Sequence, residues 1–64
     1  MVTIAELRAK HGKMSQKELA KNLNVTQSAI SNWEKDQLGI NGRHLIGIAK
    51  FFKVSTDDLL GISV

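Results

Sequence analysis

The 64-residue sequence contains no cysteine, so a disulfide cannot contribute to its stability. Its two histidines, His11 and His44, therefore have no cysteine partners, and they do not have the spacing of a zinc site. Neither a structural metal nor a cofactor is expected. A chain this short buries only about 60% of the surface that its unfolded form exposes. Its core must therefore come from packed helices alone.

Long apolar runs are also absent. No segment approaches the about 18 apolar residues that a membrane-spanning helix needs. The first ten residues, MVTIAELRAK, do not have the apolar centre and cleavage site of a signal peptide. We therefore expect a cytoplasmic protein without membrane contact. Its length leaves room for one domain, residues 1–64, and not for a second.

A catalytic arrangement is missing as well, because no nucleophile, base and oxyanion donor converge in the chain. We therefore do not expect an enzyme. The formal net charge is +3. Residues 10–35 contain five lysines and two acids, whereas residues 54–64 contain two acids and no base. A basic body with an acidic end is typical of a molecule that presents one face to phosphates.

The sequence shows no alternating apolar run and no two-residue hairpin turn, so it does not favour strands. It predicts instead an all-α chain of five helices. The first covers about residues 2–11, and the others follow side chains that can cap a helix N-terminus. Two of these caps form capping boxes with an acid three residues later, Ser15 with Glu18 and Ser55 with Asp58. The caps are expected at Ser15, Thr26, Asn41 and Ser55.

Residues that can adopt a left-handed conformation separate these helices. Gly12, Asn24 and Gly61 are expected to end the first, second and fifth helices, and the third should run from Gln27 to about Lys35. Apolar residues recur at helical spacing in the first four helices. The predicted buried stripes are Ile4, Leu7 and His11; Leu19, Ala20 and Leu23; Ala29, Ile30 and Trp33; and Leu45, Ile48, Ala49 and Phe52.

The third predicted helix has a second, polar face. At about 100° per residue, Ser28 and Asn32 project away from its apolar stripe, with Gln27 and Ser31 beside them on the exposed side. A glutamine or asparagine amide can form two hydrogen bonds with the edge of an adenine, and short hydroxyls can approach any base. A solvated helix face is the alternative, and it is the commonest fate of polar residues. The break of only three residues before this helix favours the base-reading interpretation.

Several apolar residues fall outside the predicted stripes. Residues 36–41, DQLGIN, form a loop that contains Leu38 and Ile40 where polar residues are usual. Single apolar residues on a surface are normal. The alternative is that some of them contact a second subunit or a partner. The residues in question outside this loop are Ile46, Phe51, Ile62 and Val64.

Taken in order, these features resemble the phage repressor and Cro type of helix-turn-helix, also called XRE-like. The resemblance covers most of the chain, from about Leu7 to Leu60, and implies a compact five-helix repressor-like bundle. Residues 15–34 would be its helix-turn-helix core, in which the second and third helices read DNA. The residues at the spacings of the family include Leu7, Arg8, Gly12, Ser15, Gln16, Glu18, Leu19, Ala20, Leu23, Val25, Ile30, Ser31, Trp33, Glu34, Leu45, Ile48, Ala49, Phe52, Val54, Ser55, Asp57, Leu59 and Leu60.

The resemblance also implies roles for individual side chains. Gln27, Ser28 and Asn32 would reach base edges in the major groove. Arg8 and Glu34 resemble a buried ion pair that ties the first helix to the end of the third. Gln16 would also brace the recognition helix. Contacts to the DNA backbone are expected from Gln16, Lys17, Thr26, Ser31, Lys35 and Arg43.

We therefore expect a sequence-specific double-stranded DNA-binding regulator, a repressor that occupies an operator as a homodimer. The alternative is a module of the same fold that binds a larger repressor through Leu38-Gly39-Ile40. The sequence differs from the family pattern in two places that bear on DNA binding and on pairing. The loop after Glu34 has no proline, contains Asp36 and is one residue longer than in the best-known phage members. Thr56 and Asp58 are polar at positions that the phage relatives use for pairing.

Overall fold

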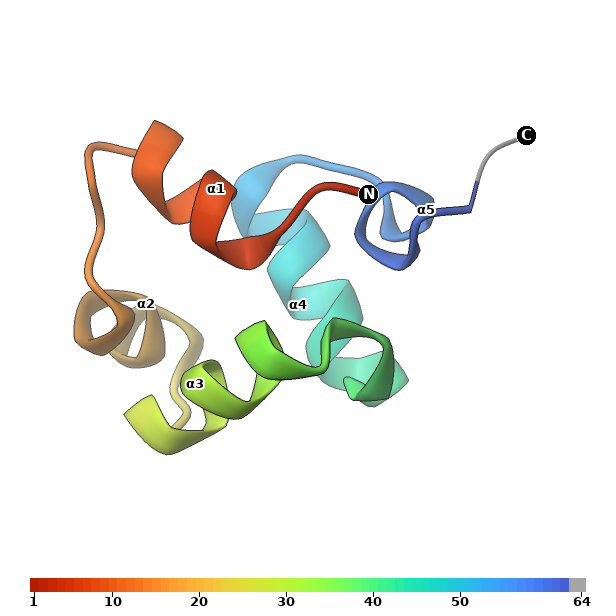
Figure 1. The fold of residues 1–64 in the computed structure, drawn as a ribbon. Coiled ribbons are helices and arrows are strands. Elements are labelled where there is room, and N and C mark those ends of the chain that lie inside the picture. Colours follow the sequence, from red (N-terminus) through yellow and green to blue (C-terminus); the bar gives the residue numbers. More distant parts are fainter. Residues whose placement is uncertain (63–64) are drawn as a thin grey trace.

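The computed structural model of the chain describes residues 1–62, which are helical throughout apart from turns and short connections. Five α-helices follow one another, with a short 3₁₀ helix, η1, between the third and the fourth (Figure 1). None of the helices in this described part has the length and apolar character to span a membrane. The five-helix prediction is confirmed. The bounds are α1 Ile4–Lys10, α2 Gln16–Leu23, α3 Gln27–Lys35, η1 Gln37–Gly39, α4 Gly42–Phe52 and α5 Thr56–Leu60.

The four predicted caps all begin a helix. The hydroxyls of Ser15, Thr26 and Ser55 and the amide oxygen of Asn41 each accept a backbone N–H three residues later, at 3.0–3.1 Å. The capping box of Ser15 is complete. At Ser55 the hydroxyl accepts from the backbone of Asp58. These local bonds fix where α2 to α5 begin.

The first helix is shorter at both ends than predicted. Thr3 caps it by accepting the Glu6 N–H at 3.1 Å, so α1 begins at Ile4 and not near Val2. The spacing predicts His11 on the inner face of this helix, which is wrong because the helix ends at Lys10. His11 is the exposed C-cap, and its ring packs on the rings of Phe51 and Phe52 at centroid distances of 5.6 and 5.5 Å.

The turns use left-handed residues as expected, with two additions, Lys13 and Lys53, the second of which ends α4 (φ 57°). Asn24 (φ 58°) ends α2 and Gly61 (φ 74°) ends α5. Between α1 and α2, both Gly12 (φ 75°) and Lys13 (φ 56°) are left-handed. The sequence predicts this conformation only at Gly12, because a lysine adopts it far less readily than a glycine.

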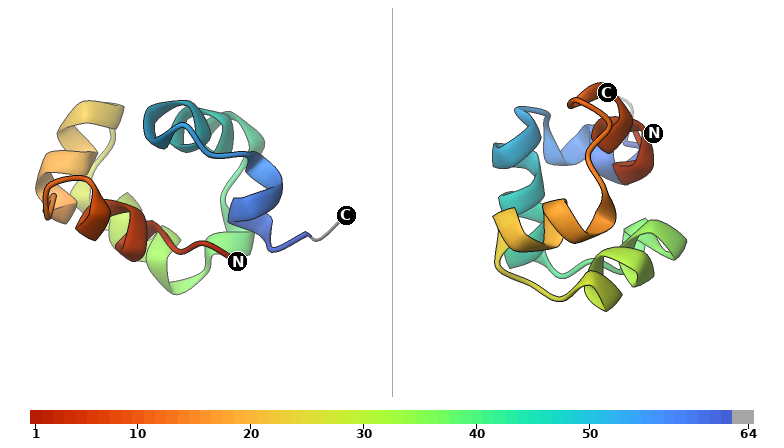
Figure 2. Two further views of the ribbon diagram at one scale, coloured as in Figure 1. Left: turned by 90° about the horizontal axis from the view of Figure 1, so that it is seen from above. Right: turned by 90° about the vertical axis from the view of Figure 1, so that its left-hand side faces the viewer.

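The core lies between the helices, with α2 and α3 on one side and α4 and α5 on the other (Figures 1 and 2). It contains every aliphatic residue of the predicted stripes except Leu23 and Ala29, which are half-buried. Trp33 is also half-buried and packs against the core from α3. The side chains with no exposed surface are Ile4, Leu19, Ile30, Ile48 and Leu59.

The segment after α3 is ordered by a buried glutamine. Gln37 is only 4% exposed, and its Oε1 accepts the Ile4 N–H at 3.0 Å. Its Nε2 donates to the carbonyl oxygens of Val2, at 2.6 Å, and Leu59, at 2.8 Å. One side chain therefore ties the N-terminal segment and α5 to the end of α3.

The same segment corrects the prediction of an exposed apolar loop. Ile40 is 7% exposed and belongs to the core, whereas Leu38 is 64% exposed. Leu38-Gly39-Ile40 therefore does not form a continuous apolar surface. Ile46 and Ile62 are about half exposed, Phe51 packs against the core, and Val64 lies outside the described residues.

Gly47, in the middle of α4, has no conformational need to be glycine. Its φ is that of an ordinary helix, and an added Cβ would meet no atom within 4 Å. We expect Gly47→Ala to stabilise the domain by about 0.5–1 kcal/mol, because glycine is disfavoured inside a helix. Thermal unfolding should show a melting temperature raised by several degrees. A lowered melting temperature would contradict the open space beside Gly47.

Candidate nucleic-acid interface

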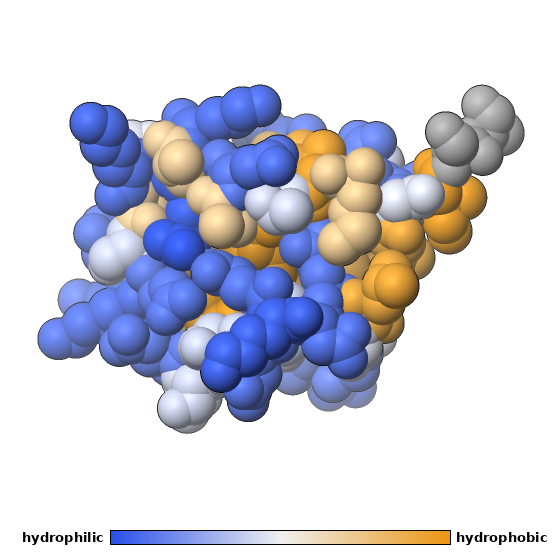
Figure 3. All heavy atoms as spheres, in the orientation of Figure 1, coloured by the Kyte–Doolittle hydropathy of each residue, from blue (hydrophilic) through white to orange (hydrophobic). Residues whose placement is uncertain are grey.

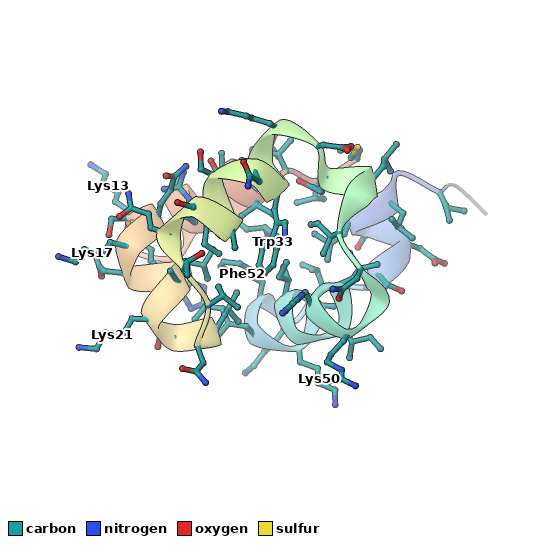
Figure 4. The ribbon with its side chains drawn as sticks, turned by 90° about the horizontal axis from the view of Figure 1, so that it is seen from below. Lys13, Lys17, Lys21, Trp33, Lys50 and Phe52 are labelled. Atoms are coloured by element: carbon teal, nitrogen blue, oxygen red, sulfur yellow. The ribbon has the colours of Figure 1, made fainter. Side chains whose placement is uncertain are left out.

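Helix α3 has two distinct faces. Ile30 is fully buried, whereas Gln27, Ser28 and Asn32 are exposed. Figure 4 shows α3 nearest the viewer with α2 beside it. Ser31 is half-buried at the edge of the polar face, and Thr26 is exposed while its hydroxyl caps the helix. The structure therefore presents the three predicted base-reading side chains together on one helical surface.

A network of charged and amide groups holds α3 in place. Arg8 Nε and Nη2 donate to the two carboxylate oxygens of Glu34 at 2.7 and 3.0 Å, a bidentate arrangement. Arg8 Nη1 donates to the Met14 carbonyl at 2.9 Å. Gln16 Nε2 donates to Glu34 Oε1 at 3.1 Å. The end of α3 is thus tied to α1, to the following turn and to the start of α2.

This network lies at the margin of the core. The side chains of Arg8 and Glu34 are 18% and 15% exposed, so the pair is partly and not completely buried. Gln16 uses one amide hydrogen for Glu34, and a primary amide has a second hydrogen. Gln16 can therefore brace α3 and still donate to another group.

The predicted backbone-contacting cations come from three helices. Lys17 comes from the first turn of α2, Lys35 from the last turn of α3 and Arg43 from the first turn of α4, and all three are exposed. Figure 4 shows Lys17 between Lys13 and Lys21 along the outer side of α2. These cations and the exposed polar face of α3 come from elements that follow one another in the chain.

The loop after α3 departs from the family pattern at Asp36, and the carboxylate of this residue has a defined place in the turn. Asp36 is exposed, and its carboxylate lies over Gly39, where an added Cβ would come within 2.6 Å of Oδ2. The carboxylate is therefore directed along its own turn. Gly39 leaves the space that this arrangement needs.

The surface of the domain has a mostly polar side and a more apolar side. In the orientation of Figure 1, the lower left, formed by α2 and α3, is mostly hydrophilic (Figure 3). Apolar surface gathers on the right-hand side of this view, toward α5 (Figure 3). The large apolar residues that are at least half exposed are Met1, Leu38, Ile46 and Ile62, and none belongs to α2 or α3.

A comparison with protein families matches residues 4–59 to a family described as helix-turn-helix. The chain belongs to this family. The match includes α1 to α4 and most of α5, so it covers the bracing network and the polar face of α3 alike. The expected family resemblance and the all-α repressor-like fold are confirmed.

Two curated members of the helix-turn-helix group are similar to the chain. It is 38% identical over 58 residues to the HTH-type transcriptional regulator ImmR of Bacillus subtilis (strain 168), covering 91% of this chain and 45% of that protein. It is 43% identical over 47 residues to the HTH-type transcriptional activator BcrR of Enterococcus faecalis, covering 73% and 23% respectively. The chain thus spans less than half the length of either relative. No solved structure gave a significant match.

Proposed function

We propose that this helix-turn-helix domain binds duplex DNA sequence-specifically and regulates transcription in the cytoplasm. The observation that carries the proposal is the exposed face of Gln27, Ser28 and Asn32 on a helix held at its far end by Arg8 and Gln16. Base readout needs side chains held at defined positions in the major groove. The names of the two relatives, a transcriptional regulator and a transcriptional activator, point to the same role.

Two roles are assigned to different side chains. Gln27, Ser28 and Asn32 select the sequence by contacting base edges. Contacts to the phosphates position the domain without reading sequence. These come from Gln16, Lys17, Thr26, Ser31, Lys35 and Arg43, which lie on α2, α3 and the start of α4 or cap α3.

The domain acts as a homodimer on a two-fold operator and represses by occupying it. One such module covers only about 600–1,000 Å² of protein surface, which is little for high specificity. Two copies on half-sites about 10 base pairs apart double the contact. On α5, Thr56 is half-buried and Asp58 exposed, so these two positions would bring polar groups to a pairing surface there.

The alternative, a module that binds a larger repressor through residues 38–40, has less support. Ile40 is in the core, and Leu38 alone remains available there. One experiment separates the two functions. Selection of sites from random duplex DNA should give a palindromic consensus with an affinity that falls steeply with salt. Flat, unselective binding would contradict the operator function and favour the interaction module.

Removing single cations tests the phosphate contacts. Lys17→Ala and Arg43→Ala should each weaken binding to all sequences alike and reduce the slope of log affinity against log salt by about one per protomer. Lys10→Ala is the matched control, because Lys10 is exposed in the last turn of α1, away from α3. Unchanged slopes for both test variants would remove these residues from the interface.

A further inference from the structure

The domain has a hollow that the proposed DNA contacts do not use. Only Arg43 belongs both to its lining and to those contacts. It has a volume of about 280 Å³ and lies between the α2–α3 turn, the end of α3 and one flank of α4. Small-molecule sites have volumes of about 300 Å³ and above, so the volume of this hollow suits a ligand of one or two rings. Its lining is Leu23, Asn24, Val25, Trp33, Arg43, His44 and Gly47.

The walls of this hollow are apolar and aromatic. Leu23, Val25 and Trp33 are only partly buried, so each keeps some apolar surface outside the core. The rings of Trp33 and His44 pack at a centroid distance of 4.9 Å with an angle of 41° between their planes. Planar side chains of this kind favour a planar ligand, because stacked and edge-on aromatic contacts both stabilise it.

Gly47 keeps the hollow open. It lies on the same flank of α4 as Arg43 and His44, four and three residues away, and a Cβ there would meet nothing within 4 Å. Neither a positive φ nor a close neighbour requires glycine at this position, and glycine is unfavourable inside a helix. A longer side chain on this flank would occupy the space that a ligand needs.

The charge of the lining indicates the sign of the ligand. Arg43 is exposed, and within residues 1–62 no acidic side chain forms an ion pair with it. A guanidinium binds a carboxylate through two parallel hydrogen bonds. No acidic residue lines the hollow. The cation at its edge therefore favours an anion attached to the planar group.

We propose that this hollow binds a small aromatic carboxylate, with the ring against Trp33, Leu23 and Val25 and the carboxylate on Arg43. The proposal has a regulatory consequence that rests on the proposed DNA-binding function. Arg43 cannot pair with the ligand and with a phosphate through the same hydrogen bonds. The ligand and DNA therefore compete, and the ligand lowers the affinity for DNA by linkage.

Binding is measured on the free full chain by nuclear magnetic resonance, with benzoate as the probe and benzyl alcohol as its neutral counterpart. Trp33 is the only tryptophan, so its indole N–H gives a single signal from the wall of the hollow. Benzoate should shift this signal saturably. Benzyl alcohol should bind about threefold to fivefold more weakly, because it cannot form the ion pair with Arg43 and one exposed ion pair changes an affinity by about this factor. No saturable shift, or equal affinities, would overturn the proposal.

Filling variants locate the site. Gly47→Leu should abolish the saturable shift, and Gly47→Met, with a flexible side chain, is the second filling variant in case the first does not fold. Gly42→Leu is the control, since Gly42 is on the same helix, outside the hollow, with open space around its Cβ. Arg43→Gln should reduce the affinity for benzoate to that for benzyl alcohol. Unaltered binding to the folded filling variants, or loss in the control, would overturn the assignment.

A second arm measures DNA binding at constant ionic strength. Saturating benzoate should weaken the wild-type affinity for the selected site several-fold and leave the affinity of Gly47→Leu unchanged. Equal wild-type affinities with and without benzoate would overturn the competition. If no DNA sequence is bound at all, the proposed function fails, while the Trp33 signal still decides whether the ligand site exists.

Discussion

Gln37→Ala is expected to destabilise the domain by about 3 kcal/mol, although Gln37 is polar and lies outside the α-helices. The substitution leaves the Ile4 N–H and the carbonyl oxygens of Val2 and Leu59 without their present partner. Each buried polar group that loses its hydrogen bond costs about 1–3 kcal/mol, and the removed side chain also leaves a cavity. A domain of this size has a total stability of about 3–10 kcal/mol. The variant should therefore lose between about a third and all of the domain's stability.

Urea unfolding of the variant and of two controls tests this expectation. Leu38→Ala changes the next residue, which is 64% exposed, and should alter stability by less than about 0.5 kcal/mol. Gln37→Met keeps most of the side-chain volume and removes the hydrogen bonds, so it should remain destabilised by about 2 kcal/mol. A midpoint of Gln37→Ala equal to that of the wild type would show that Gln37 does not tie the termini together.

Arg8→Ala is expected to destabilise the domain by about 2–3 kcal/mol. The pair with Glu34 is 18% and 15% exposed, so its loss should cost less than the about 3–5 kcal/mol of a fully buried pair. Glu34 would keep one hydrogen bond, from Gln16, while the Met14 carbonyl would lose the bond from Arg8. The affinity for DNA should fall as well, since the end of α3 is then less firmly held.

Thermal unfolding with a double-mutant cycle measures this contribution. Arg8→Ala and Glu34→Ala should combine with an interaction energy of at least about 1 kcal/mol, because the two side chains share hydrogen bonds. Lys10→Ala, an exposed change in the same helix, is the control. An unchanged melting temperature for Arg8→Ala would contradict the structural role of the pair.

The parts of the fold that could be predicted from the sequence depend on local interactions. Ser15, Thr26, Asn41 and Ser55 each bond a backbone group three residues away, so their effect is visible in a short stretch of sequence. Gln37 bonds groups 22 to 35 residues away, and no local pattern indicates such partners. The sequence therefore predicted where the helices begin and not how the two ends of the chain are joined.

The environments of Ile40, in the loop after α3, and of His11, at the end of α1, also depend on contacts that the local sequence does not show. Ile40 was assigned to an exposed loop because polar residues surround it, yet η1 turns it into the core. His11 has the spacing of the α1 stripe, but the helix ends before it, and its ring lies on Phe51 and Phe52. The His11 error arises because spacing along a helix indicates direction only as far as the helix extends. The Ile40 error arises because polar neighbours in the sequence do not show which way a turn directs a side chain.

The candidate site was predictable in part for a similar reason. Helical spacing alone places Ser28 and Asn32 opposite Ile30 with Gln27 beside them, and all three are exposed in the structure. The hollow beside Trp33 and Arg43 was not foreseen, because α2, α3 and α4 must pack before their side chains enclose a space. Gly47, a glycine inside a helical pattern, was the signal that could have indicated it.

The central claim is that the exposed face of α3 reads base pairs, and measuring sequence preference in single variants tests it most directly. Gln27→Ala and Asn32→Ala are compared with Asn22→Ala, an exposed asparagine on α2 whose amide bonds its own helix. Each variant is measured on the selected site and on a scrambled duplex at one salt concentration. The two α3 variants should lose about 1–3 kcal/mol of discrimination, or roughly 5- to 150-fold, while Asn22→Ala keeps the wild-type ratio. Wild-type preference in both α3 variants would contradict the claim.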